Sequence, residues 1–169
     1  MAGTGRIQSS ACSKKNLKDP EDSLSRVCYY FQKHHVKFLI IGARACAFHG
    51  HIRATQDIDL LIQNDRENIL KAIDTIRELY PHLQEELKPE DFYESIVVKI
   101  LDDPEIDVSI SARSVTYEDS LKDLKKTFQD GIEIPYMCID SLIQTKSTQR
   151  EQDQWDVKVL TEIKKKSNL

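Results

Sequence analysis

The motif Asp57-Ile58-Asp59 constrains the fold of this chain more than any other feature of its sequence. It lies within residues 56–63, an otherwise apolar run with the length of a strand. Successive side chains on a strand point to opposite faces, so the two carboxylates share one face. Two acids on a half-buried face repel each other and lose hydration, which destabilises the fold unless a cation neutralises them.

Size and composition are those of one globular domain. The chain has 169 residues, of which 40% are hydrophobic and 31% are charged, and its formal net charge is −4. This charge does not favour nucleic-acid binding, although a local cluster of lysines would permit an RNA partner. No apolar run approaches the roughly 18 residues of a membrane span, so no membrane partner is expected. We interpret residues 1–18 as a disordered segment that precedes a single domain at 19–169.

The cysteines and histidines give no sign of a zinc site. Cys12, Cys28, Cys46 and Cys138 contain no CxxC pair, and the histidines lack HExxH spacing. Three of the cysteines lie in apolar segments, which is typical of small buried side chains in a reducing compartment. We therefore expect a cytoplasmic protein.

The pattern of apolar residues predicts an α/β fold, in the α+β sense, with helices packed against a mixed sheet. Strands are expected at residues 37–41, 56–63, 96–101, 105–111 and 132–138. The third and fourth of these should form a hairpin around residues 102–104. Helices are expected at residues 20–35, 43–49, 65–80, 116–126, 141–146 and 151–165. Asp19 should cap the first helix and Asp140 the fifth.

A second strand supplies a third carboxylate. In residues 105–110, Glu105, Asp107 and Ser109 share one face, and the apolar residues share the other. Asp107 lies in the middle of its strand, as a metal ligand should, whereas Glu105 lies near the turn. Hard oxygen ligands suit Mg²⁺ or Mn²⁺, and phosphoryl-transfer sites combine acids from neighbouring strands. The alternative is a solvent-exposed sheet face that happens to be acidic.

The segment before Asp57 has features of a phosphate site. Gly42 separates an apolar run from the start of a helix, where free backbone N–H groups can face an anion. Arg53 and Thr55 precede the acid pair and are expected to face the same cleft, where Arg53 could hold phosphate oxygens bidentately. The alternatives are a tight turn that needs glycine for steric reasons and an ordinary surface arginine.

Read together, the segments GARACAFHG, RATQDIDLLI and EIDVSIS resemble the nucleotidyltransferase superfamily, which has the fold of DNA polymerase beta. The resemblance is greatest to a small bacterial branch with the patterns GGxAxxxHG and RxTxDID. That branch includes the nucleotidyltransferases of abortive-infection toxin–antitoxin systems. The segments DSLIQTK and REQDQWD near the C-terminus are similar to the last helices of the branch, so the likeness covers about residues 36–160.

The resemblance implies that Asp57, Asp59 and Asp107 are the catalytic residues and bind the metals, and that Asp107 helps to activate an acceptor hydroxyl. It also implies which residues bind the nucleotide: Gly42, Ala43, Arg53, Thr55 and Lys146. The pattern has Gly or Ser at the position of Ala43, a departure that concerns the rate or the fit of the nucleotide and not the fold.

The C-terminal matches have simpler interpretations as well. Lys146 has the alternative of a helix-surface lysine. Arg150, Asp153 and Asp156 are expected to form a structural ion-pair set that fixes the last helices.

Two functions are compatible with these residues. The first is an Mg²⁺- or Mn²⁺-dependent enzyme that transfers a nucleoside monophosphate from a nucleoside triphosphate to a hydroxyl of a small molecule, protein or RNA. The second is a weak or inactive module that binds a nucleotide or a protein partner, for example in a toxin–antitoxin pair. The three acids favour the enzyme and Ala43 favours the module, while the acceptor is not specified by the sequence.

Overall fold

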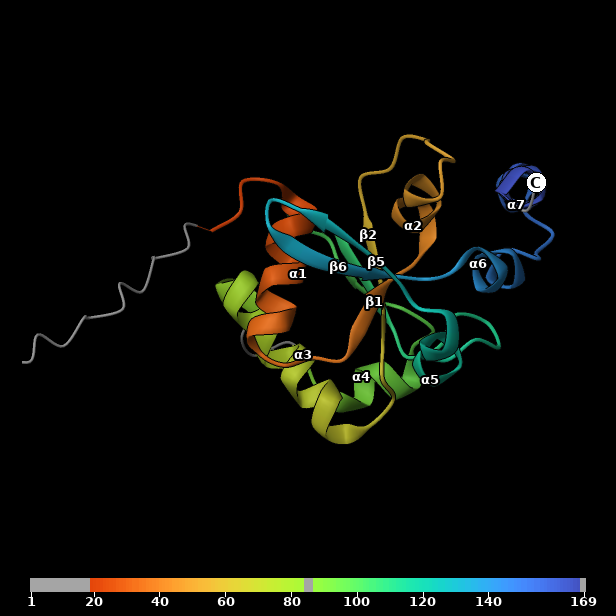
Figure 1. Cartoon of the computed structure of the whole chain (residues 1–169). Coiled ribbons are helices and arrows are strands. Elements are labelled where there is room, and N and C mark those ends of the chain that lie inside the picture. The colour runs from red at the N-terminus through yellow and green to blue at the C-terminus, as the bar shows by residue number, and fades with distance from the viewer. Residues whose placement is uncertain (1–18, 84–86, 168–169) are drawn as a thin grey trace, which may run out of the picture.

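The computed structural model of the chain describes residues 19–83 and 87–167. The segment expected to be disordered, 1–18, lies outside these residues. The strands are β1 (Phe38–Ile40), β2 (Ile58–Ile62), β3 (Val98–Ile100), β4 (Ile106–Ser109), β5 (Lys125–Gln129) and β6 (Ile132–Tyr136). They form one six-stranded mixed sheet in the order β3-β4-β2-β1-β6-β5, with helices packed around it (Figure 1). This confirms the expected fold class.

The helices differ widely in length, and the longest is the last. They are α1 (Ser23–Lys33), α2 (Gly42–Phe48), α3 (Arg66–Leu79), α4 (Pro89–Glu94), α5 (Tyr117–Ser120), α6 (Ile139–Thr145) and α7 (Glu151–Ser167), with 3-10 turns at Pro81–Leu83 and Leu121–Asp123. Within 19–83 and 87–167, none of them combines the length and the apolar character that crossing a bilayer would require.

The core explains why the two central strands are so apolar. β1 is buried at all three of its positions, and in β2 only Asp59 is partly exposed. Helices α1 and α3 contact each other and contribute apolar stripes at helical spacing, which include the buried Phe31 and Ile73. Burial on both sides of the central strands leaves few positions for polar groups, so the acids in this part of the sheet stand out.

The register of the sheet places two of the acids singled out in the sequence side by side. β2 pairs in parallel with β4, and Asp59 is opposite Asp107. β3 and β4 form the predicted hairpin, in which Lys99 is opposite Asp107. Because directly opposed residues point to the same face, the side chains of Lys99, Asp107 and Asp59 form one row across three strands.

The first helix starts later than predicted. Its N-cap is Asp22, whose carboxylate accepts a hydrogen bond of 2.9 Å from the Ser25 backbone N–H. Asp19, the predicted cap, instead accepts a hydrogen bond of 2.9 Å from the Tyr30 hydroxyl. Both acids precede the helix within a few residues, and only the one that reaches a free N–H of the first turn can cap it.

The predicted helix at 116–126 is wrong in its second half. Helix α5 ends at Ser120, and Lys125–Gln129 forms β5, an edge strand paired antiparallel with β6. The side chains of β5 are mostly exposed, so it lacks the apolar alternation that would have identified it. The pair Asp130-Gly131 does mark it, because both residues have positive φ angles, +52° and +78°, in the turn between the strands.

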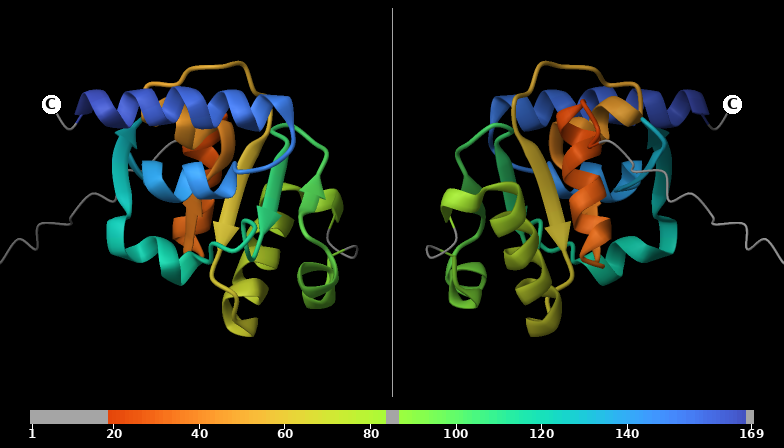
Figure 2. Two further views of the ribbon diagram at one scale, coloured as in Figure 1. Left: turned by 90° about the vertical axis from the view of Figure 1, so that its right-hand side faces the viewer. Right: turned by 90° about the vertical axis from the view of Figure 1, so that its left-hand side faces the viewer.

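The predicted N-cap of helix α6, which is the fifth of the predicted helices, is also wrong. Cys138 is the N-cap of α6, and Asp140 lies in its first turn. The Asp140 carboxylate forms an ion pair with Lys164 of α7. This pair helps to hold α7, which lies along the loop between α2 and β2 in both views of Figure 2.

Candidate metal and nucleotide site

Three carboxylates come together at one side of the sheet. Asp57 lies directly before β2, Asp59 lies in β2, and Asp107 lies in β4. One carboxylate oxygen from each lies within 4.8 Å of the others, and all three residues are partly buried. The structure therefore brings together the three acids that the sequence singled out, at a spacing suited to a shared cation.

Asp59 is the least neutralised member of this acidic triad, by which we mean Asp57, Asp59 and Asp107. Burial, followed by the charges of Asp57 and Asp107, raises the pKa of its carboxyl to about 6. Among the residues described, none donates a hydrogen bond to this carboxylate. A raised pKa with no local donor is the condition that a bound cation relieves.

Asp57 is held by a neighbour in sequence. The Thr55 hydroxyl donates a hydrogen bond of 2.5 Å to Oδ1 of Asp57. This hydrogen bond is the main reason why the pKa of the Asp57 carboxyl lies below its ordinary value. Thr55, which the resemblance implied as a nucleotide contact, thus orients an acid of the triad in this structure.

Asp107 has a cationic partner that the sequence analysis missed. Nζ of Lys99 on β3 donates to Oδ2 of Asp107 at 2.5 Å. The hairpin prediction contained the signal, because a turn at 102–104 places residue 99 opposite residue 107. The register of a predicted hairpin can therefore identify a residue beside a predicted ligand.

Gly42 is needed for steric reasons at this site. It is the first residue of α2 and has a φ angle of +62°, a backbone conformation that favours glycine. A Cβ atom at this position would lie 2.0 Å from Oδ2 and 2.6 Å from Cγ of Asp59. The start of α2 therefore approaches Asp59 as closely as it does only because residue 42 has no side chain. Ala43 beside it is buried, with 2% of its surface exposed.

Asp59 and Asp107 line a cleft of about 290 Å³ that also contains basic groups. Gly42 lies beside them, and Arg113, Lys146, Thr148 and Arg150 are also among the lining residues. The cleft thus combines acids that could hold a metal with guanidinium groups that could hold an anion.

Arg113 occupies an unusual backbone position in the wall of this cleft. Its φ angle is +56°, in the left-handed region, and its Nη1 donates a hydrogen bond to the Ser147 carbonyl oxygen. It lies in a tight turn closed by paired backbone hydrogen bonds between Ala112 and Val115. Non-glycine residues in this region are strained and concentrate at functional sites. No motif of the sequence marks Arg113 or Arg150 as cleft residues.

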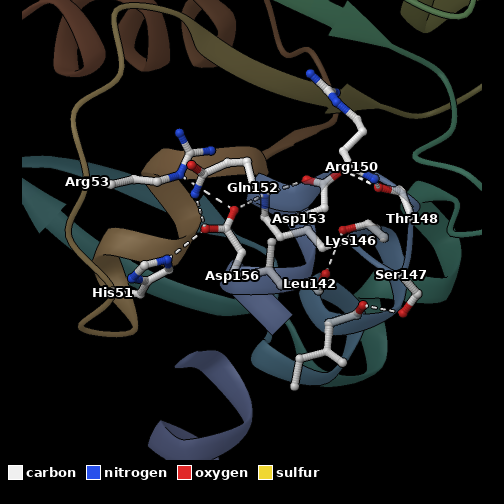
Figure 3. A network of polar contacts seen from close by, with 12 residues as sticks. His51, Arg53, Leu142, Lys146, Ser147, Thr148, Arg150, Gln152, Asp153 and Asp156 are labelled. Carbon is white, nitrogen blue, oxygen red and sulfur yellow. Dashed lines mark hydrogen bonds and ion pairs between the residues drawn. The ribbon is translucent and has the colours of Figure 1, made fainter. Parts of the chain in front are cut away.

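A second group of charges surrounds Asp156 of α7 (Figure 3). Its Oδ2 lies 2.7 Å from Lys146 Nζ and 3.5 Å from Arg53 Nε. Its Oδ1 lies 2.7 Å from Nε2 of His51, and Lys146 also lies 3.6 Å from Asp153. We call these five residues, His51, Arg53, Lys146, Asp153 and Asp156, the Asp156 network.

The Asp156 network ties together segments that are far apart in sequence. Asp156 is fully buried, which opposes its ionisation, but its contacts with Lys146, His51 and Gln152 outweigh burial and lower its pKa. The predicted ion-pair set of the last helices is wrong for Arg150, which has no ion pair with any residue that the structure describes. Asp153 and Asp156 pair with Lys146 instead. Arg53 and Lys146, implied as nucleotide contacts, both point toward Asp156 (Figure 3).

Comparisons with known proteins identify the fold. No protein-family model matches the sequence, and no curated protein matches it. The structure is similar to that of an antigenic nucleotidyltransferase-like protein from Paracoccidioides brasiliensis, with a TM-score of 0.52 and 13% sequence identity. The similarity covers 81% of this chain and 72% of that one. The chain therefore has the fold of a nucleotidyltransferase-like protein.

Proposed function

We propose that the protein is a metal-dependent nucleotidyltransferase, which moves a nucleoside monophosphate from a nucleoside triphosphate to a hydroxyl acceptor. The observation that carries this proposal is the acidic triad, whose carboxylate oxygens meet within 4.8 Å and of which Asp59 and Asp107 line the cleft. The similar fold supports the same reaction class, and the residues implied by the resemblance in sequence coincide with the triad.

The residues of the triad fit a hard divalent cation such as Mg²⁺ or Mn²⁺. They offer only carboxylate oxygens, the donor type that these ions prefer. Burial, followed by the charges of Asp57 and Asp107, raises the pKa of Asp59, which supports a cation as its partner. Asp57, Asp59 and Asp107 would hold the ion, which when bound supplies positive charge to the phosphate oxygens.

The reaction exchanges one phosphorus–oxygen bond for another. The acceptor oxygen forms a bond with the α-phosphorus, the bond from that phosphorus to the bridging oxygen breaks, and pyrophosphate leaves with the electron pair. The Asp107 carboxylate helps to take the proton of the acceptor hydroxyl. Because Asp59 and Asp107 are fixed on adjacent paired strands, the protein orients both groups before the substrate arrives.

We propose that the phosphates lie against the basic wall of the cleft, where Arg113 and Arg150 supply guanidinium groups. Lys146 lines the same cleft but is already paired with Asp156 at 2.7 Å, and Arg53 is paired with the same carboxylate. A phosphate contact by either would therefore require a partial exchange of partners. The two cleft arginines need no such exchange.

The proposal names no particular acceptor, and its cellular setting rests on fewer observations. Several surface lysines are paired with acids, among them Lys126 with Glu133 and Lys165 with Glu162, so the surface gives no particular support to an RNA acceptor. A protein partner and a place in a toxin–antitoxin pair rest on the resemblance alone. The buried free thiols of the described cysteines support a reducing, cytoplasmic setting.

Nucleotide binding without catalysis is the second candidate. Lys99 already occupies one oxygen of Asp107, which would weaken metal binding and favour a module of low activity. The two candidates share the same site and differ in turnover.

Calorimetry of Mg²⁺-dependent nucleoside triphosphate binding tests the site itself. We expect the native chain to bind a triphosphate only with Mg²⁺, and Asp57→Asn/Asp59→Asn to lose this binding. Asp140→Asn is the matched control, because Asp140 is an exposed acid paired with Lys164 away from the triad. Equal binding by the native chain and the double variant would contradict the proposal. Pyrophosphate release in the presence of candidate acceptors then separates the enzyme from the module.

A further inference from the structure

We infer that Lys99 is a built-in counter-ion of the acidic triad, and that a divalent cation must displace the Lys99 ammonium from Asp107 in order to bind. This inference rests on the proposed function, since it takes the triad to be the metal site. It adds a residue that controls how readily the site accepts its metal.

The geometry makes Lys99 part of the site. Lys99 lies directly opposite Asp107 in the antiparallel pair β3–β4, and Asp59 lies opposite Asp107 on the other side. Its Nζ is 2.5 Å from Oδ2 of Asp107, whose side chain is only 13% exposed. The ammonium therefore occupies one of the two oxygens that Asp107 could offer to a metal ion at the triad.

The charge of Lys99 acts on the whole triad. Its hydrogen bond to Asp107 raises the pKa of Lys99, and the charges of Asp57 and Asp59 add to the effect. A divalent cation held by the same oxygens would lie within a few ångströms of the ammonium. Two like charges at such a distance repel strongly in a partly buried site, so both cannot keep the same carboxylate.

The Lys99 side chain is able to leave Asp107 without disturbing the fold. It is 58% exposed and lies on the edge strand of the sheet, so the ammonium can move into solvent without any change in the backbone. Lys146 is the opposite case, because its side chain is 9% exposed and lies between Asp153 and Asp156. Of these two lysines, Lys146 holds structure together and Lys99 is exchangeable.

Displacement gives the site a preference for metal and polyphosphate together. A metal ion alone must expel the ammonium into water. When a triphosphate arrives with the metal, the displaced ammonium beside Asp107 gains an anionic partner. Metal binding and nucleotide binding should therefore strengthen each other in the native chain.

Lys99→Met tests the inference, because methionine keeps much of the length of the side chain and removes its charge. We expect this variant to bind Mn²⁺ about 2- to 5-fold more tightly than the native chain in calorimetry without nucleotide. Lys126→Met is the matched control: Lys126 is a strand lysine that is 53% exposed and paired with Glu133 at 2.8 Å. It should leave Mn²⁺ affinity unchanged.

The sign of the change separates displacement from a structural role. If Lys99 only held Asp107 in place, Lys99→Met would bind Mn²⁺ more weakly, and weaker or equal binding overturns the inference while the metal site stands. A second readout is the gain in Mn²⁺ affinity on adding α,β-methylene-ATP, which should be smaller in Lys99→Met than in the native chain. If neither protein binds Mn²⁺ at all, the proposed function fails, and the inference fails with it.

Discussion

The acidic triad and the Asp156 network show two opposite treatments of buried negative charge in one small fold. At Asp156, a fully buried carboxylate is surrounded by Lys146, Arg53 and His51, and its pKa is lowered. At the triad, three carboxylates meet within 4.8 Å, the exposed Lys99 pairs with Asp107, and the pKa of Asp59 is raised to about 6.

The difference indicates what each group of charges contributes. Charges that are paired within the protein fix the positions of its segments, and removing one partner leaves the other buried and unpaired. Charges that the protein leaves unneutralised destabilise the fold and persist where a ligand makes use of them. The comparison therefore assigns stability to the Asp156 network and supports the proposed metal-binding role of the triad.

The largest expected effect is at the network. Asp156→Asn should destabilise the protein by roughly 3–5 kcal/mol, because it leaves the Lys146 ammonium buried with only Asp153 at 3.6 Å. Urea unfolding measures this change. Asp140→Asn, which breaks an exposed pair, should cost less than about 1 kcal/mol. A small effect of Asp156→Asn would show that the network is not what holds α7.

The triad should respond in the opposite direction. Asp59→Asn should stabilise the metal-free protein at neutral pH by about 2–3 kcal/mol, because it removes a carboxylate whose ionisation the fold disfavours. The same variant should lose Mn²⁺ binding. Unfolding in the presence of a chelator measures the first effect, and calorimetry measures the second.

The pH dependence of the stability difference tests whether the charge of Asp59 is its cause. The pKa of Asp59 is higher in the folded protein, about 6, than the ordinary value of 3.8, so the folded state binds the proton more tightly. The contribution of Asp59 to stability is therefore present below about pH 4 and is lost as the pH rises to about 6. The stability difference between Asp59→Asn and the native chain should grow across this range. A difference that is constant with pH would mean that the charge of Asp59 is not its source.

The smallest expected effect is at Thr55, whose hydroxyl stabilises the fold and orients Asp57 of the triad. Thr55→Val removes the hydroxyl that donates to Asp57 and keeps the shape of the side chain. We expect a loss of about 1 kcal/mol in stability and a rise in the pKa of Asp57 toward its ordinary value. Metal affinity should consequently weaken most at acidic pH, where Asp57 becomes protonated. Unchanged metal affinity at all pH values would contradict a role of Thr55 in metal binding and leave the nucleotide contact that the resemblance implies.

Much of the fold could be predicted because it depends on local patterns. The apolar runs of β1, β2 and β6 and the helical spacing in α1 and α3 are properties of short segments. β5 escaped prediction because an edge strand with exposed side chains carries no apolar alternation. Its turn at Asp130-Gly131 was a usable signal.

The residues of the candidate site could likewise be predicted where they depend on short segments, and could not where they depend on tertiary packing. The triad was accessible because Asp57 and Asp59 lie two residues apart at the start of β2, and Asp107 lies in another acidic strand. The partners of Arg53 and Lys146 were not accessible, because they depend on how α7 packs more than a hundred residues after Arg53. A charged side chain in a short motif can be identified from sequence, but the neutralising group opposite it is set by tertiary structure.

Because Gly42 has no side chain, the residues at positions 42 and 59 constrain each other although they belong to different elements. The carboxylate of Asp59 occupies the space that any larger residue at position 42 would need. In a mutant library, any larger residue at position 42 would have to adopt a left-handed backbone conformation and displace the carboxylate at position 59. A sequence with this fold that carries a bulkier residue at position 42 should therefore lack the close approach of α2 to that carboxylate.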